Sequence, residues 1–177
     1  ARVSTCLLGK FNCQNIVLAS AMAYMLGVEF ADIVKSISNL TPTKNRLELL
    51  DMGNFLIIDD SYNSNYKGFI EALNILNKSN GKKILLTPGI VELGKYRKEL
   101  YKSLVDHIIR NSDIVILVGY FQTRTLFNLL KDSNLEIYVL HSFKEGYNFF
   151  LEISKRYDEC SLLIENDVPD IYRIGLI

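Results

Sequence analysis

The segment Asp59–Asn65 brings several kinds of polar chemistry together in seven residues. It follows the apolar run 55–58 and has the order Asp59-Asp60-Ser61-Tyr62-Asn63-Ser64-Asn65. Carboxylates can accept hydrogen bonds from ribose hydroxyls, amides can pair with an adenine edge, and a phenol can stack or donate. Helix capping by Ser64 or Asn65 is the alternative explanation. Because capping accounts for only one or two of these residues, we expect the loop to bind a ligand.

Two further loops carry weaker signals. In the loop 88–94, Glu92 precedes several basic residues and could help to recognise a substrate, although a solvated helix start is the commoner explanation. This loop matches neither the G-x-G-x-x-G nor the G-x-x-x-x-G-K-[ST] phosphate-binding pattern. The loop 165–170 is also rich in polar residues. The sequence therefore predicts no phosphate-binding loop at 88–94.

Metal sites and covalent nucleophiles lack support in the sequence. His107 and His141 are far apart and lie outside any metal-binding spacing. Cys6, Cys13 and Cys160 have no C-x-x-C spacing, which argues against a zinc site or a disulfide framework. The G-x-S-x-G pattern of serine hydrolases is absent as well.

The composition is that of a globular protein with one domain, or with one domain and part of another. The chain has 177 residues, and its 20 basic side chains balance its 20 acidic ones. Without net charge it has no field that would attract nucleic acid or an anionic membrane. Its apolar runs fall short of the ~20 residues that span a bilayer. With no signal-peptide pattern and an odd number of cysteines, we expect a cytoplasmic protein, and the start at Ala1 without Met suggests a fragment.

Two helices and a connector are predicted ahead of the first strong strand. Apolar residues spaced by three and four predict a buried helix over 12–27 and a second helix over 29–40, which Pro42 ends. Residues 41–54 are rich in turn formers around a short apolar piece at 47–50, so they predict a connector with one strand. We place a domain boundary between residues 51 and 52.

From residue 55 onward, strands and helices alternate. The predicted strands are 55–58, 84–87, 114–118, 136–140 and 161–164, and the predicted helices lie near 66–78, 95–110, 122–131 and 143–157. This order predicts an α/β fold with a Rossmann-like, doubly wound, mostly parallel sheet. The run 172–177 could add an edge strand. In such sheets ligands bind outside the carboxyl ends of the strands, and the loop after residue 58 lies at such an end.

Four motifs in this order resemble the Mur ligases, a family of ATP-dependent amide ligases. The segment 9–21 is similar to the G-x-[HF]-N-x-x-N-A-x-A-A that closes their central ATPase domain, and 45–48 resembles the G-R-L-E that follows. The segment 59–65 resembles the D-D-S-Y-N-A-N-P that opens the C-terminal domain in the branch that adds D-alanyl-D-alanine. The segment 91–94 is similar to the M-x-E-L-G of that branch.

The resemblance implies a piece of an enzyme. Residues 1–51 would be the end of the central ATP-binding domain, and residues 52–177 the Rossmann-like C-terminal domain. The implied reaction uses ATP and Mg2+ to phosphorylate a carboxylate of a UDP-muramyl peptide, and D-alanyl-D-alanine then attacks the acyl phosphate. The family's phosphate loop and magnesium ligands lie upstream of this segment. The N-terminal and central domains would therefore be its partners, and the fragment alone would be inactive.

The motifs also imply roles for single residues. The residues implied to bind the nucleotide are Asn12, Asn15, Arg46, Asp60, Tyr62 and Asn63. Among them, Asn15 would contact adenine, Arg46 would reach the phosphates and Asp60 would bind ribose hydroxyls. The residues expected at the substrate are Ser64, Asn65 and Glu92.

The chain also departs from the family pattern. Asn45 stands where the family has Gly, Tyr66 where it has Pro, and Glu165-Asn166-Asp167 where many members have K-G-S. These differences leave open which acceptor and donor are used. Another ligase of the superfamily, such as one that adds glutamate to a folate, is an alternative. A stand-alone nucleotide-binding module without catalysis is a second one.

Overall fold

The computed structural model describes residues 2–63, 65–90 and 97–166. Its elements are α1 (Lys10–Met25), α2 (Phe30–Ser38), β1 (Glu48–Asp51), β2 (Phe55–Asp60), α3 (Tyr66–Lys78), β3 (Lys82–Thr87), α4 (Arg97–Asn111), β4 (Ile114–Val118), α5 (Tyr120–Leu130), β5 (Glu136–Leu140), α6 (Phe143–Ser154) and β6 (Cys160–Glu165). The predicted helices and strands are confirmed with small shifts at their ends, and the expected edge strand at 172–177 lies outside the described residues. None of the described helices is both long and apolar enough to cross a bilayer.

The strands form one sheet in the order β1-β2-β6-β3-β4-β5. β1 runs antiparallel to β2, and all other neighbouring pairs are parallel. The chain adds β3, β4 and β5 in one direction and then returns to insert β6 between β2 and β3. This reversal confirms the predicted doubly wound, mostly parallel sheet. It also brings the carboxyl ends of β2 and β6 side by side.

Apolar side chains cover both faces of the sheet, because successive residues of a strand point to opposite faces. Val115 and Leu117 of β4 belong to the core that β4 shares with α3, α4 and α5. Ile114 and Ile116 point the other way and pack in a second core with Phe150 of α6. Burial on both faces explains why β4 is a continuous apolar run rather than an alternating one.

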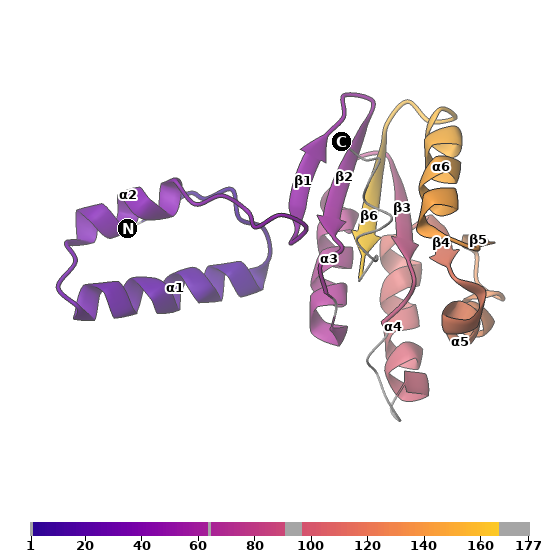
Figure 1. Cartoon of the computed structure of the whole chain (residues 1–177), viewed down its shortest axis with the longest axis horizontal. Coiled ribbons are helices and arrows are strands. Elements are labelled where there is room, and N and C mark those ends of the chain that lie inside the picture. Colours follow the sequence, from indigo (N-terminus) through magenta and orange to yellow (C-terminus); the bar gives the residue numbers. More distant parts are fainter. Residues whose placement is uncertain (1, 64, 91–96, 167–177) are drawn as a thin grey trace.

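The helical pair α1–α2 stands to one side of the sheet (Figure 1). α1 has no buried residue, and the side chains of Val17, Leu18 and Met22 are each at least 65% exposed. The prediction of a buried helix over 12–27 is therefore wrong for this chain by itself. The reason is that α1 carries its own apolar side chains on all sides of the helix, whereas α2 packs against only one of these sides.

The strand expected within the connector is part of the sheet. β1 pairs with β2 from Glu48 opposite Asp59 to Asp51 opposite Leu56. Sheet membership thus begins ahead of the domain boundary that we placed between residues 51 and 52, and that boundary remains a proposal. Because the two strands are antiparallel, the residues just before Glu48 lie at the carboxyl end of β2.

Candidate functional site

Residues 45–47 of the connector lie against the loop that follows β2. The side-chain amide of Asn45 donates to Asp59 Oδ2 over 2.7 Å, and the Asn45 carbonyl accepts from the Tyr62 N–H over 3.1 Å. The Leu47 N–H donates to Asp60 Oδ1 over 3.2 Å. Asn45 and Leu47 both have positive φ angles, 63° and 48°. These hydrogen bonds offset the strain of two left-handed residues and fix the connector on the loop.

Arg46, between these two residues, stacks on Tyr62. The guanidinium carbon lies 4.2 Å from the centre of the Tyr62 ring, which is within the range of a cation–π interaction. Both side chains are exposed, so a ligand can reach them. The structure therefore brings Arg46, Asp60 and Tyr62, three of the residues expected to bind a nucleotide, together at the carboxyl end of β2.

Asp60 is the last residue of β2 and is half-buried. Burial, which disfavours the charged form, raises the pKa of its carboxyl to about 6. The hydrogen bonds from the Leu47 N–H and the Glu165 side chain, and the charge of Arg46, lower this pKa, whereas the charge of Asp59 raises it. Asp60 is therefore mostly ionised at pH 7 and can accept hydrogen bonds from hydroxyl groups.

Glu165 and Asn166, whose part in this site the sequence did not predict, lie beside Asp60 at the end of β6. Glu165 is paired with Asp60 in the parallel register of β2 and β6, and its side chain is fully buried. The Asn166 N–H donates to the Asp60 carbonyl over 3.3 Å, and its side-chain amide donates to the Gly89 carbonyl. The polar run directly after the apolar strand 161–164 was the signal in the sequence for both residues.

The loop after β3 is held in place by Tyr101 of α4. The Ile90 N–H donates to the Tyr101 hydroxyl over 2.9 Å, and this hydroxyl donates to the Ile90 carbonyl over 3.1 Å. Gly89 has a φ angle of 78°, and a Cβ atom there would lie 2.5 Å from the Tyr101 hydroxyl. Glycine is therefore needed at this turn, which positions the carbonyl that Asn166 contacts.

Asn12 and Asn15 come from α1 rather than from the loops of the sheet. The Asn12 side-chain amide donates to the Leu8 carbonyl over 2.7 Å, and Asn15 is exposed. The first turn of α1 is anchored by the Lys10 N–H, which donates to Glu71 of α3 over 2.8 Å. From there α1 leads away from the sheet (Figure 1). The expected nucleotide contacts of Asn12 and Asn15 stay predictions.

The remaining candidates come from the loop after β2 and the loop after β3. Asn65 is the N-cap of α3, where its Oδ1 accepts from the Gly68 N–H over 3.0 Å, as the capping alternative predicted. Asn63 is exposed beside the site. Ser64 and Glu92 lie outside the described residues. The substrate roles of Ser64, Asn65 and Glu92 therefore stay predictions.

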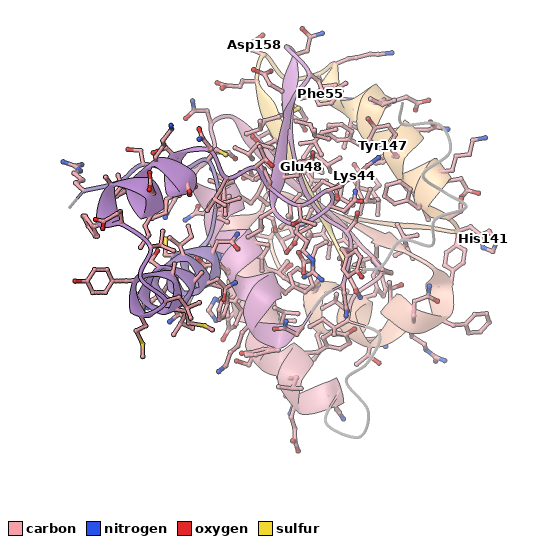
Figure 2. The ribbon with its side chains drawn as sticks, turned by 60° about the vertical axis from the view of Figure 1, so that its left-hand side comes forward. Lys44, Glu48, Phe55, His141, Tyr147 and Asp158 are labelled. Carbon is pink, nitrogen blue, oxygen red and sulfur yellow. The ribbon has the colours of Figure 1, made fainter. Side chains whose placement is uncertain are left out.

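In the described part of the chain, neither a group of metal ligands nor His141 belongs to this site. Within residues 2–63, 65–90 and 97–166, no three His, Cys, Asp or Glu side chains gather in a way that could hold a metal ion. The His141 ring lies 6.1 Å from the ring of Tyr120. Figure 2 shows His141 at the edge of the molecule, far from Lys44 and Glu48 of the connector.

Comparison of the sequence with curated proteins identifies relatives. No protein-family model matches the chain. The chain is 29% identical over 154 residues to the UDP-N-acetylmuramoyl-tripeptide--D-alanyl-D-alanine ligase of Borreliella burgdorferi. This alignment covers 84% of the chain and 32% of the Borreliella protein.

Solved structures share the fold. MurF from Acinetobacter baumannii superposes with a TM-score of 0.83 at 25% identity, over 93% of this chain and 36% of that one. The MurF ligase from Thermotoga maritima in complex with ADP superposes with a TM-score of 0.72 at 19% identity, over 94% of this chain and 36% of that one. The chain thus spans about a third of the length of these three proteins. The curated relative and the solved structures with this fold are Mur ligases, so the motifs, the sequence similarity and the fold of the chain support membership in the Mur ligase family.

Proposed function

We propose that the chain is the C-terminal part of a cytoplasmic, ATP-dependent ligase of peptidoglycan precursor synthesis. The complete enzyme would join D-alanyl-D-alanine to UDP-N-acetylmuramoyl-tripeptide through an amide bond. The Borreliella relative carries the name of this activity, and the Thermotoga MurF structure holds ADP. A reducing cytoplasm fits the free thiols of Cys6, Cys13 and Cys160.

The observation that carries this proposal is the grouping of Arg46, Tyr62 and Asp60 at the carboxyl end of β2. An ionised Asp60 accepts hydrogen bonds from the ribose hydroxyls, and the guanidinium fork of Arg46 matches the geometry of phosphate oxygens. Stacking on Tyr62 limits the rotamers of Arg46, so less side-chain entropy is lost when the nucleotide binds. The site therefore offers a cation for the phosphates and a carboxylate for the ribose, with an aromatic ring that orients the cation, and this combination fits ATP.

The upstream domains would supply the rest of the site. We infer that they provide the phosphate loop and the magnesium ligands, and that ATP bridges them to this chain. Closure around ATP would exclude water from the acyl phosphate, which water would otherwise hydrolyse. In this arrangement ATP supplies the phosphoryl group, while Arg46 and Asp60 orient the nucleotide.

The exposed apolar side chains of α1 indicate that another part of the complete protein covers this helix. Val17, Leu18 and Met22 lie on a helix that α2 covers on one side only. Large exposed apolar surfaces in proteins usually mark an interface. We propose that the remainder of the central domain covers this helix, and that residues 1–51 belong to that domain while residues 52–177 form the C-terminal one.

The test is a ligation assay with the full-length polypeptide. Asp60→Ala and Arg46→Ala should each strongly reduce ATP-dependent ligation of D-alanyl-D-alanine to UDP-N-acetylmuramoyl-tripeptide. Lys155→Ala is the matched control, because Lys155 lies with Asn54 and Asp158 at the opposite, amino-terminal end of the parallel strands. Wild-type turnover of both site variants would contradict the assigned roles.

Two further measurements separate the alternatives. Turnover of a folate with glutamate, in place of the muramyl peptide, would favour another ligase of the superfamily. Micromolar ATP binding by the 177-residue chain alone, about −8 kcal/mol, would favour a stand-alone binding module. We expect weaker binding, because most phosphate contacts would come from the upstream domains.

A further inference from the structure

The carboxyl groups of Asp60 and Glu165 meet at the ends of two neighbouring strands. The parallel register of β2 and β6 pairs the two residues directly, so their side chains lie on the same face of the sheet. Hydrogen bonding from the Glu165 side chain lowers the pKa of Asp60. Glu165 is fully buried, whereas Asp60 is half-buried. The backbone beneath them is also joined, since the Asn166 N–H donates to the Asp60 carbonyl over 3.3 Å. The backbone of the sheet therefore fixes the two residues side by side.

A hydrogen bond between two carboxyl groups requires one proton, because ionised carboxylates can only accept. Two ionised carboxylates paired directly on neighbouring strands would repel each other. The environments of the two groups decide which one holds the proton. Burial and the charge of Asp59 favour the neutral form of Asp60. The hydrogen bond from the Leu47 N–H and the positive charge of Arg46 favour its ionised form, and Asp60 is only half-buried. Glu165 has no exposed surface, so desolvation favours its neutral form.

We propose that Glu165 is a positioning residue for the nucleotide site: as a neutral acid it donates a hydrogen bond to the Asp60 carboxylate and fixes its orientation. This inference rests on the proposed role of Asp60 in binding ribose. The Leu47 N–H and the Glu165 hydroxyl hold the carboxylate from the connector and from β6. The remaining lone pairs of the Asp60 carboxylate then point toward the ribose hydroxyls, so less side-chain entropy is lost when the nucleotide binds.

The first experiment tests whether Glu165 is protonated, in the absence of nucleotide. Infrared difference spectra of the full-length protein with 13C-labelled glutamate, compared with those of Glu165→Gln, report whether Glu165 is a carboxylic acid. We expect a carboxylic acid signal at pH 7 in the wild-type protein that the variant lacks. A signal of an ionised carboxylate for Glu165 at pH 7 would overturn the inference.

The second experiment tests the effect on the nucleotide. Glu165→Gln keeps a hydrogen-bond donor of similar size, so we expect the KM for ATP to stay within about twofold of the wild-type value. Glu165→Met keeps the volume and loses the donor, and loss of a hydrogen bond to a charged group should raise the KM for ATP about tenfold, with kcat changed far less.

The outcomes distinguish this inference from the proposed function. If Asp60→Ala leaves the KM for ATP unchanged, Asp60 does not bind the nucleotide and the proposed function fails. If Asp60→Ala raises the KM but Glu165→Met does not, the positioning role of Glu165 is overturned while the function stands. If Glu165→Met does not fold, the infrared comparison of the wild-type protein with Glu165→Gln still decides.

Discussion

The guanidinium carbon of Arg46 lies 4.2 Å from the centre of the Tyr62 ring, across the junction between the connector and the loop after β2. The hydrogen bond from the Tyr62 N–H to the Asn45 carbonyl holds the two backbones together beneath this stack. Among residues 2–63, 65–90 and 97–166 no carboxylate forms a salt bridge with Arg46, although the charge of Arg46 acts on Asp60, so the aromatic ring orients the guanidinium. The exposed guanidinium can present its hydrogen-bonding fork to phosphate oxygens.

Removing the aromatic ring should weaken nucleotide binding. An exposed cation–π contact contributes about 0.5–1 kcal/mol, so Tyr62→Ala should raise the KM for ATP of the full-length enzyme about two- to fivefold. Tyr62→Phe keeps the ring and should stay within about twofold. Steady-state kinetics with ATP as the varied substrate provides the measurement. An equal loss in both variants would show that the phenol hydroxyl, rather than the ring, matters.

The stability of the chain should depend on pH through Asp60. Its pKa in the folded chain is about 6, above the ordinary value of 3.8, because burial disfavours the charged carboxylate. Protonation therefore favours the folded state: this contribution is complete below about pH 4 and is lost as the pH rises through about 6. Urea unfolding between pH 4 and pH 7.5 should show it, and Asp60→Asn should flatten the profile. Identical slopes in both proteins would contradict the role of Asp60.

Nucleotide binding should show the opposite pH dependence. Ribose hydroxyls donate to an ionised carboxylate, so the KM for ATP should rise as the pH falls below about 6 and Asp60 becomes protonated. Asp60→Asn already lacks the charge and should have a high KM that changes little over this range. The measurement is kcat and KM at a series of pH values, with Lys155→Ala as the control. A flat profile for the wild-type enzyme would count against the contact.

Asn166 should stabilise the carboxyl end of β6 in two ways. Its φ angle is 80°, and its side-chain amide donates to the Gly89 carbonyl. Asn166→Ala loses this hydrogen bond, and alanine adopts the left-handed region less readily than asparagine, so we expect a loss of about 3 kcal/mol in the free energy of unfolding. Asn166→Gly loses the same side chain but adopts this φ angle without strain, so it should be more stable than the Ala variant by about 1 kcal/mol. Equal midpoints of urea unfolding for the Ala and Gly variants would show that the left-handed φ angle at residue 166 does not destabilise the Ala variant.

The Tyr101 hydroxyl should contribute to the stability of the loop after β3. Tyr101→Phe leaves the buried N–H and carbonyl of Ile90 without this partner, so we expect a loss of about 1–3 kcal/mol in the free energy of unfolding. The matched control is Tyr66→Phe. The Tyr66 hydroxyl lies 2.6 Å from Ser103 Oγ at an exposed position, where its loss should cost less than about 0.5 kcal/mol. A similar effect of both substitutions in urea unfolding would contradict the role of Tyr101.

Local patterns in the sequence were enough to predict most elements. The apolar runs 114–118 and 136–140 correspond to β4 and β5, and the helical spacing over 66–78 corresponds to α3. These predictions succeeded because hydrophobic periodicity depends on neighbours along the chain. The grouping of Asp60 and Tyr62 was equally accessible, since one loop contains both.

Burial was harder to predict, as α1 shows. Its apolar residues have the helical period, but periodicity does not say whether another segment covers them. In this chain α2 packs against one side, and residues such as Leu18 stay exposed. What a helix buries depends on its tertiary neighbours, so the sequence pattern alone misjudged this element.

The sequence by itself determined the alternation of strands and helices, the polar loop at the end of β2 and the motifs that place Arg46 and Asp60 in one family pattern. Only the tertiary structure decided that Glu165 meets Asp60 and that Tyr101 holds Ile90. Both contacts join residues from different elements. They depend on the insertion of β6 beside β2 and on the packing of α4 against the sheet, and these are properties of the folded chain rather than of any local stretch of it.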